Sequence, residues 1–178
     1  AIALIFASIS IHAQIAIGKQ MVSNTSVSLE FDNTENRGLI LPYLENKTGI
    51  TENGTIIYDV TDHKVKYLQD TNAWFDLSVD ATGFADIAIQ TTKTESITAK
   101  AAIGTSAATD TTPGVLVLSD SDKAMILPKV ANPHINIINP SPGMMVYDTT
   151  NKCLKIFTSV NNGTSFEWHC ITTQTCPD

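Results

Sequence analysis

Short apolar runs alternate with polar turn segments along most of the chain, and this alternation predicts short strands with little helix. In the first half, turns are expected at 59–64 and 70–73, where Asp, Thr and Asn interrupt the apolar residues. In the second half they are expected at 148–152 and at Asn161-Asn162-Gly163, where Asn-Gly is a strong hairpin signal. The intervening strands are expected at Leu39–Leu41, Thr55–Tyr58, Val65–Leu68 and Trp74–Leu77. Consecutive strands of this kind form a β-meander.

The same series of motifs occurs twice, which indicates an internal repeat. The first two motifs match without a gap between them, and the later ones match after short insertions in the second copy. The matching segments are Ala16-Ile17-Gly18 with Ala102-Ile103-Gly104, Ile40-Leu41-Pro42 with Ile126-Leu127-Pro128, Gly54–Asp59 with Gly143–Asp148, and Trp74 with Trp168. Two copies of one structural unit are therefore expected.

The repeat divides the chain into a first β unit at 14–79, a connector at 80–101 and a second β unit at 102–178. The connector is rich in Thr and Ala, and its apolar residues are too sparse for a core of its own. The expected fold is all-β, with two tandem β-meander repeats joined by this extended connector. Each unit is close to the lower size limit for independent stability, so the two are expected to pack on each other or on neighbours.

Residues 1–13 have the profile of an export signal. They contain no Asp, Glu, Lys or Arg, and the apolar run that begins at Ala1 thins into serines and ends at the small residue Ala13. A membrane span needs about 20 apolar residues, so this shorter run is interpreted as a signal peptide whose beginning is missing, with cleavage between Ala13 and Gln14. The alternative is a buried first strand. Cleavage predicts a mature protein without a membrane span that is secreted to the cell surface or the extracellular space.

Composition and charge narrow the class of protein. The chain has 178 residues, 43% of them hydrophobic and 16% charged, which is enough apolar material to form a folded core. The formal net charge of −7 removes the electrostatic basis for binding nucleic acid. A globular protein without a nucleic-acid partner is expected.

The order of the motifs carries a resemblance to known proteins. The string Ala13–Gly18 is followed by Arg37-Gly38-Leu39-Ile40-Leu41-Pro42, then by Gly54–Asp59 and Trp74. This order resembles secreted surface proteins of the Bacteroidota and the repeat modules of phage tail-fibre-like proteins. The resemblance implies a structural or adhesin-like protein that acts through surface complementarity and has no catalytic role. The chain departs from the family pattern at Tyr43, where a basic residue usually follows the proline; the second copy keeps one, Lys129.

The sequence contains no pattern typical of an active site or a cofactor site. The four histidines are scattered, and no nucleophile elbow or phosphate-binding glycine loop occurs. We therefore expect no enzymatic activity, no catalytic residue, no cofactor and no metal. Asp59, Asp62 and His63 share one turn and could bind a cation weakly, but aspartates at such positions more commonly cap turns.

Four aromatic residues recur at equivalent positions of the two units: Tyr58, Trp74, Tyr147 and Trp168. Aromatic ring faces stack on sugar rings, so these residues are candidates for binding glycans. The alternative function is therefore a carbohydrate-binding or receptor-binding fibre tip. Recurrence within a meander more commonly reflects core packing.

Cysteine placement predicts a disulfide in the second unit. Cys153 and Cys170 occupy the positions of Lys64 and Asp76 in the first unit, and they flank the last turn. If they lie directly opposite each other, the hairpin is centred on Asn161-Asn162. The first unit is then expected to hold a cross-strand ion pair where the second holds a disulfide. Cys176 is the odd cysteine, free or competing for Cys170.

Each unit has two edge strands, and no expected helix is long enough to cover them. Pairing of edges between molecules would satisfy their backbone groups, with residues 80–101 as candidate strands in that interface. The alternative is a monomer whose edges are protected by Lys64, Lys66 and Lys155 and by short strands. Self-association or binding to other surface proteins is therefore expected alongside the glycan alternative.

Overall fold

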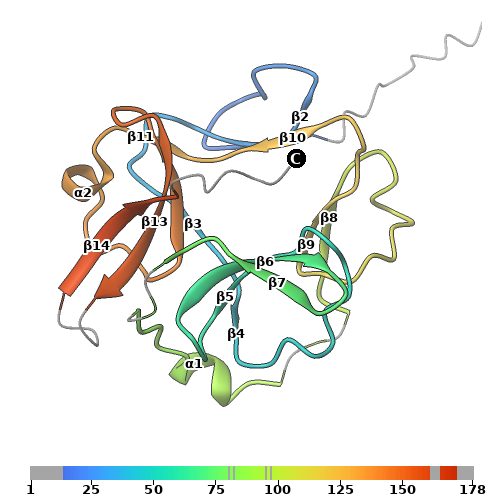
Figure 1. Cartoon of the computed structure of the whole chain (residues 1–178). Coiled ribbons are helices and arrows are strands. Elements are labelled where there is room, and N and C mark those ends of the chain that lie inside the picture. The colour runs from blue at the N-terminus through green and yellow to red at the C-terminus, as the bar shows by residue number, and fades with distance from the viewer. Residues whose placement is uncertain are drawn as a thin grey trace, which may run out of the picture.

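A computed structural model describes residues 14–171, except positions 80, 82, 95 and 97 and the segment 161–164 (Figure 1). The expected signal segment 1–13, the Asn161-Asn162-Gly163 turn and Cys176 lie outside these described residues. The described chain is almost entirely β-structure, which confirms the expected fold class. Its two helices, α1 (Ala88–Thr91) and α2 (Pro133–Asn136), are single turns. Within the described part, no helix is long and apolar enough to cross a membrane.

Among the described residues, the strands follow the internal repeat, with seven in each unit and in the same order. The first unit contains β1 (Ile15–Ile17), β2 (Val27–Phe31), β3 (Leu39–Ile40), β4 (Tyr43–Leu44), β5 (Ile56–Asp59), β6 (Lys64–Asp70) and β7 (Ala73–Asp76). The second contains β8 (Ala101–Ile103), β9 (Leu116–Leu118), β10 (Ala124–Ile126), β11 (Lys129–Val130), β12 (Met144–Asp148), β13 (Cys153–Val160) and β14 (Ser165–Cys170). Each strand of the first unit therefore has a counterpart in the second.

The last three strands of each unit form an antiparallel meander, as expected, but the strand expected to begin it at Leu39–Leu41 does not pair within its own unit in the described chain. β5, β6 and β7 pair in sequence, as do β12, β13 and β14. A short parallel strand adds to the edge of each meander, and the sequence did not predict it. Tyr43 of β4 pairs with Tyr58, and Lys129 of β11 pairs with Tyr147 at the equivalent position. These added strands have two residues each, which is too short for an alternating pattern to show.

The first two strands of each unit pair in parallel, also without a clear sequence signal. Ile15 of β1 lies opposite Leu29 of β2, and Ala101 of β8 lies opposite Leu116 of β9. The expected ungapped match between the units is wrong by one residue here, because the second unit has one more residue between these strands. The match returns to its original offset before β10.

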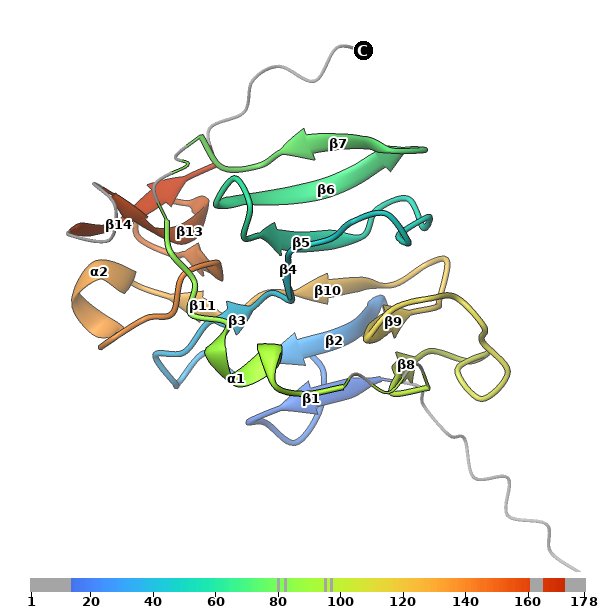
Figure 2. The same ribbon diagram turned by 90° about the horizontal axis from the view of Figure 1, so that it is seen from below.

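The two units exchange strands with each other (Figure 2). β10 of the second unit pairs in parallel with β2 of the first, forming a three-stranded sheet β1-β2-β10. β3 of the first unit pairs antiparallel with β12 of the second. The hydrophobic core is likewise shared, since one buried cluster contains Tyr58 and Val65 together with Met145 and Ile156. The two units therefore pack on each other within one chain.

The connecting segment contributes a residue to this core: Ala85 is buried in the shared cluster. The segment also contains the single-turn helix α1. In this single chain, Ala101 alone among the described residues of 80–101 lies in a strand, β8. The pairing of this segment with another molecule stays a prediction.

Candidate functional site

The contact between the two units is centred on Tyr58. Its side chain is completely buried, and its ring packs edge-on against Tyr43 at a centroid distance of 5.4 Å. A Cβ atom added at Gly143 would lie 2.9 Å from the Tyr58 ring, so the backbone of the second unit approaches as closely as glycine permits. The Tyr43 hydroxyl donates a hydrogen bond of 2.6 Å to the carbonyl oxygen of Pro142. The first unit's tyrosines thus hold the turn before β12 in place.

A second close approach lies where β3 crosses onto β12. A Cβ atom added at Gly38 would lie 2.3 Å from Cγ of Met144 and 3.0 Å from Cγ1 of Val146. Gly38 therefore leaves the space that the Met144 side chain fills. The equivalent position in the second unit is Ala124, which is exposed.

The exchanged strand β10 covers one edge of β2, and most side chains of β2 are buried. With β10 along its edge, Val27 and Leu29 are 3% and 2% exposed. Glu30 is buried as well, and its carboxylate accepts hydrogen bonds from Lys19 Nζ at 2.7 Å and from the Ser23 backbone N–H at 2.5 Å. Burial raises the pKa of Glu30, but these hydrogen bonds outweigh it and lower the pKa below its ordinary value. With β10 in place, the apolar side chains of Val27 and Leu29 and the charged side chain of Glu30 are all shielded from solvent.

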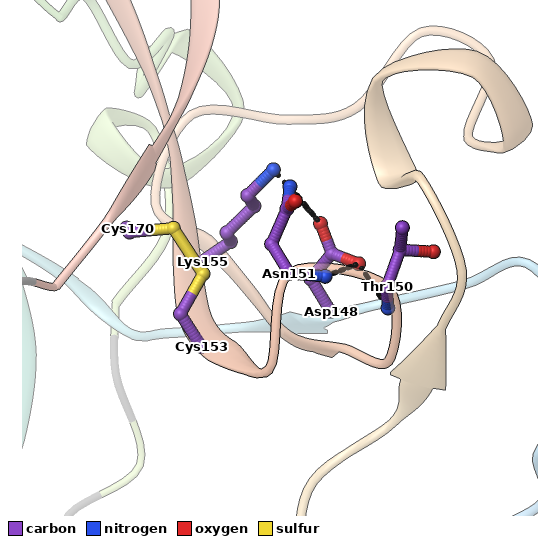
Figure 3. Close-up of a disulfide and its surroundings, with 6 residues drawn as sticks. All are labelled: Asp148, Thr150, Asn151, Cys153, Lys155 and Cys170. Carbon is purple, nitrogen blue, oxygen red and sulfur yellow. Dashed lines mark hydrogen bonds and ion pairs between the residues drawn. A yellow bond between two sulfur atoms is a disulfide. The ribbon is translucent and has the colours of Figure 1, made fainter.

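Each unit also contains a buried aspartate at the end of its central strand, and the two find different lysine partners. Asp59 accepts hydrogen bonds from Lys47 Nζ and from the N–H and hydroxyl of Thr61. Asp148 forms a 2.8 Å ion pair with Lys155, which is itself buried (Figure 3). The second unit has proline at the position that matches Lys47, so the lysine of the neighbouring strand takes its place.

The charge of Asp148 is strongly stabilised in the folded protein. Burial raises the pKa of its carboxyl, but hydrogen bonds from Lys155 and from the backbone N–H groups of Thr150 and Asn151 outweigh burial and lower the pKa from 3.8 to about 2. A folded-state pKa below the unfolded value means that the stabilisation is complete above about pH 4 and disappears as the pH falls towards 2.

We therefore expect the difference in free energy of unfolding between the wild type and Asp148→Asn to be constant from pH 7 to about pH 4. It should shrink as the pH falls from 4 towards 2, because the Asp148 carboxyl of the unfolded wild type takes up its proton near its ordinary pKa while the folded carboxylate stays charged until about pH 2. Urea unfolding at a series of pH values measures this difference. A difference that is the same at pH 2.5 and pH 6 would contradict the assignment.

The predicted disulfide between Cys153 and Cys170 is present, with a Cα–Cα distance of 5.8 Å, beside Lys155 (Figure 3). The expected register is wrong by two residues, because Cys170 lies opposite Lys155 and not opposite Cys153. The disulfide joins a diagonal pair, which the twist of antiparallel strands can bring together. In the first unit the equivalent diagonal is the expected ion pair, with Lys64 Nζ 2.7 Å from Asp76 Oδ2.

Replacing both Cys153 and Cys170 by serine is expected to lower the free energy of unfolding by about 2–4 kcal/mol, because the cross-link restricts the unfolded chain. Denaturant titration measures the loss. The matched control is Lys64→Ser, which removes the partly exposed ion pair at the equivalent diagonal, leaves Asp76 paired with Lys66, and should cost about 1 kcal/mol or less. A loss in the cysteine variant no larger than that of Lys64→Ser, or a free Cys153 thiol in peptide maps of the oxidised protein, would contradict the role of the disulfide.

The four candidate stacking residues do not share one environment. Tyr58 is completely buried and offers no ring face to a sugar in the described chain. Tyr147 and Trp74 are partly exposed and lie in separate sheets. Trp168 is partly exposed and packs against Phe157 at a centroid distance of 5.3 Å.

The turn that contains Asp59, Asp62 and His63 is held by lysines. Lys47 pairs with Asp59, and Lys66 pairs with Asp62 at 2.5 Å. Among the described residues, no group of three His, Cys, Asp or Glu side chains could hold a metal ion. His63 adopts a left-handed backbone conformation, as Lys152 does at the equivalent position, so both residues serve the turn.

Comparison with known proteins gives one similarity. A family model described as the phage tail like trimerisation region matches residues 102–177. This range coincides with the second β unit from β8 onward and includes both disulfide cysteines. No curated protein and no solved structure matches the chain. The match supports the tail-fibre-like character that the motif order predicted.

Proposed function

We propose that this chain is a structural protein of the tail-fibre type that assembles as three copies, with its second β unit contributing to the contacts between them. The observation that carries the proposal is the match of a trimerisation region to residues 102–177, which is one whole repeat. Such a unit acts through the shape and chemistry of its surface, so the proposal includes no catalysis. The proposal also includes an adhesin-like role at a surface, which the match to a phage tail like region supports.

The proposal also includes export to the cell surface or the extracellular space. Two features support it: the uncharged apolar profile of residues 1–13 and the disulfide between Cys153 and Cys170, since disulfides persist in oxidising compartments. We expect the mature chain to begin at Gln14, with or without cyclisation to pyroglutamate. Intact-mass measurement of the exported protein tests this, and a mature chain that retains residues 1–13 would contradict it.

Light scattering coupled to size-exclusion chromatography tests the association. The proposal predicts a mass of three chains, each of at most 19.2 kDa, that stays constant on moderate dilution. A mass of one chain at every concentration would overturn the proposal.

Glycan or receptor binding remains the second candidate function. The observation in its favour is a shallow surface hollow whose lining includes His134, Glu167 and the partly exposed indole of Trp168. A glycan array probed with the wild type and with Trp168→Ala tests it. Binding that is lost in the variant would support this function, and the absence of binding by the wild type would remove it.

A further inference from the structure

Strand β9 has an edge that its counterpart in the first unit does not leave open. β2 is covered on one side by β1 and on the other by β10, and its Leu29 is buried. β9 pairs with β8 in the equivalent register, but no other strand of the described chain pairs with it. Leu116, which matches Leu29, is 43% exposed as a result. The sheet β8-β9 thus lacks the third strand that the sheet β1-β2-β10 contains.

Strand β5 lacks a neighbour in the same way. The first half of β12 pairs with β3, at Met144 and Met145, and both side chains are buried. The matching residues of the first unit are Thr55 and Ile56, which are only partly buried. In the described chain, the strands that pair with β5 are β4 and β6, and β4 reaches only Tyr58 and Asp59. The edge at Thr55 and Ile56 is therefore open.

The two exchanged strands have open edges to match. β3 pairs with β12 and β10 pairs with β2, and each has no second partner among the described strands. β3 and β10 are equivalent strands of the two units. Within the chain, β3 pairs only with the unit that follows it, and β10 pairs only with the unit that precedes it. Among the described strands, β3 thus lacks a partner from a preceding unit, and β10 lacks one from a following unit.

We infer that a second copy of this chain supplies both neighbours by repeating the contact between the two units. In this arrangement β3 of the second copy lies parallel to β9, and β10 lies antiparallel to β5 of the second copy. The inference rests on the proposed self-association and specifies which surfaces carry it. Unpaired strand edges of this kind favour pairing with another chain, because backbone N–H and C=O groups gain partners.

The register follows from the pairs seen inside the chain. Met125 lies opposite Leu29, so Leu39 of the second copy is placed opposite Leu116. Leu39 lies opposite Met145, so Met125 is placed opposite Ile56 of the second copy. The first of these contacts buries Leu116 beside β3, where Ile40 is 48% exposed in the single chain. Apolar side chains that face solvent in one copy therefore meet apolar side chains of the next.

Side-chain sizes fit the repeated contact at two further positions. Gly143 touches the Tyr58 ring inside the chain, whereas a Cβ atom added at Gly54 would have no neighbour within 4 Å. The repeated contact places the partly exposed Tyr147 over Gly54 of the second copy. In the same way, Gly38 leaves room for Met144, and its counterpart Ala124 meets the smaller Thr55. The larger residue on one side is thus matched by the smaller on the other.

This contact joins different surfaces of the two copies, so it is head-to-tail. A head-to-tail contact closes into a ring when its rotation returns to the start, and otherwise grows into a filament. The proposed three-chain assembly corresponds to the closed case. Both strand contacts then occur at each of its interfaces.

Mixing two variants, each with one free thiol besides the Cys153–Cys170 disulfide, tests the inference. Leu39→Cys and Leu116→Cys chains, each carrying Cys176→Ser and a different tag, are co-expressed, purified through both tags and treated with a short bis-maleimide. A covalent dimer that carries both tags is expected, because the two thiols lie on neighbouring chains. The matched control replaces Leu39→Cys by Ile138→Cys, at a residue that is 84% exposed and lies outside the contact, and should give no dimer.

Light scattering of the same samples distinguishes a failure of the inferred strand contacts from a failure of the proposed three-chain association. A mass of three chains without the cross-link would overturn the inferred surfaces and leave the proposed association intact. A mass of one chain would overturn both. A second variant, Leu116→Lys, is expected to shift the protein to single chains because it places a charge at the closed edge, whereas Ile138→Lys should keep the assembled mass. Assembly that survives Leu116→Lys unchanged would also count against the inference.

Discussion

Replacement of Asp148 by Asn is expected to lower the free energy of unfolding at pH 7 by about 3–5 kcal/mol. The reason is the partner that remains: Lys155 is 6% exposed and pairs with this carboxylate at 2.8 Å. In the variant, the Lys155 ammonium group still loses its hydration on folding, but its partner is a neutral amide oxygen. That weaker interaction does not offset the cost of burying the charge. The loss should be read from chemical denaturation with the slope of the transition unchanged.

A double variant provides the control for this interpretation. Combining Asp148→Asn with Lys155→Met removes both charges and keeps the length of the side chain on β13. Since replacing a buried ion pair as a whole is often close to neutral, most of the lost stability should return. If the double variant is less stable than Asp148→Asn alone, the cost does not arise from an unpaired lysine.

The second large effect is expected at the contact between the units. Gly143→Ala should lower the free energy of unfolding by about 2–5 kcal/mol, since two costs combine. Its φ of 74° lies in the left-handed region, which costs a residue with a Cβ atom about 1–2 kcal/mol. The new methyl group would also approach the completely buried Tyr58 ring, and such overpacking costs about 1–3 kcal/mol.

Gly54→Ala is the matched control within the same chain. Gly54 occupies the equivalent turn with a φ of 85°, and the space beside its Cβ position is open in the single chain. Single chains carrying Gly54→Ala should therefore show the backbone cost alone. The comparison is best made in a Leu116→Lys background, where assembly is not expected to contribute. Equal destabilisation by the two substitutions would show that the Tyr58 contact does not limit the packing of the units.

Much of the fold follows from the repeat in the sequence. The motif pairs Gly54–Asp59 with Gly143–Asp148 and Trp74 with Trp168 correspond to equivalent strands, and Trp74 and Trp168 pair with the equivalent residues Leu68 and Phe157. The exchange of β3 and β10 could not be predicted in this way. A two- or three-residue apolar strand carries no information about which unit it joins, and tertiary packing decides between them.

Matching positions between the two units predicted the disulfide but not the strand register around it. Matching Cys153 to Lys64 and Cys170 to Asp76 identified the bonded pair, because both units place these residues near each other across a hairpin. It did not give the register, since a diagonal pair and a directly opposed pair look alike in sequence. The ion pair of Asp148 was not predicted either. It depends on Lys155, which takes a partner different from that of its counterpart Lys66.

Hydrogen exchange of the β9 backbone tests whether this strand gains a second neighbour in the assembly, as the repeated contact requires. The measurement compares residues 115–118 in wild-type protein, at a concentration where light scattering gives three chains, with the same residues in Leu116→Lys. We expect slow exchange in the assembled wild type, comparable to that of residues 27–31, and fast exchange in the variant. Fast exchange of β9 in a wild-type protein that has the mass of three chains would contradict the repeated contact.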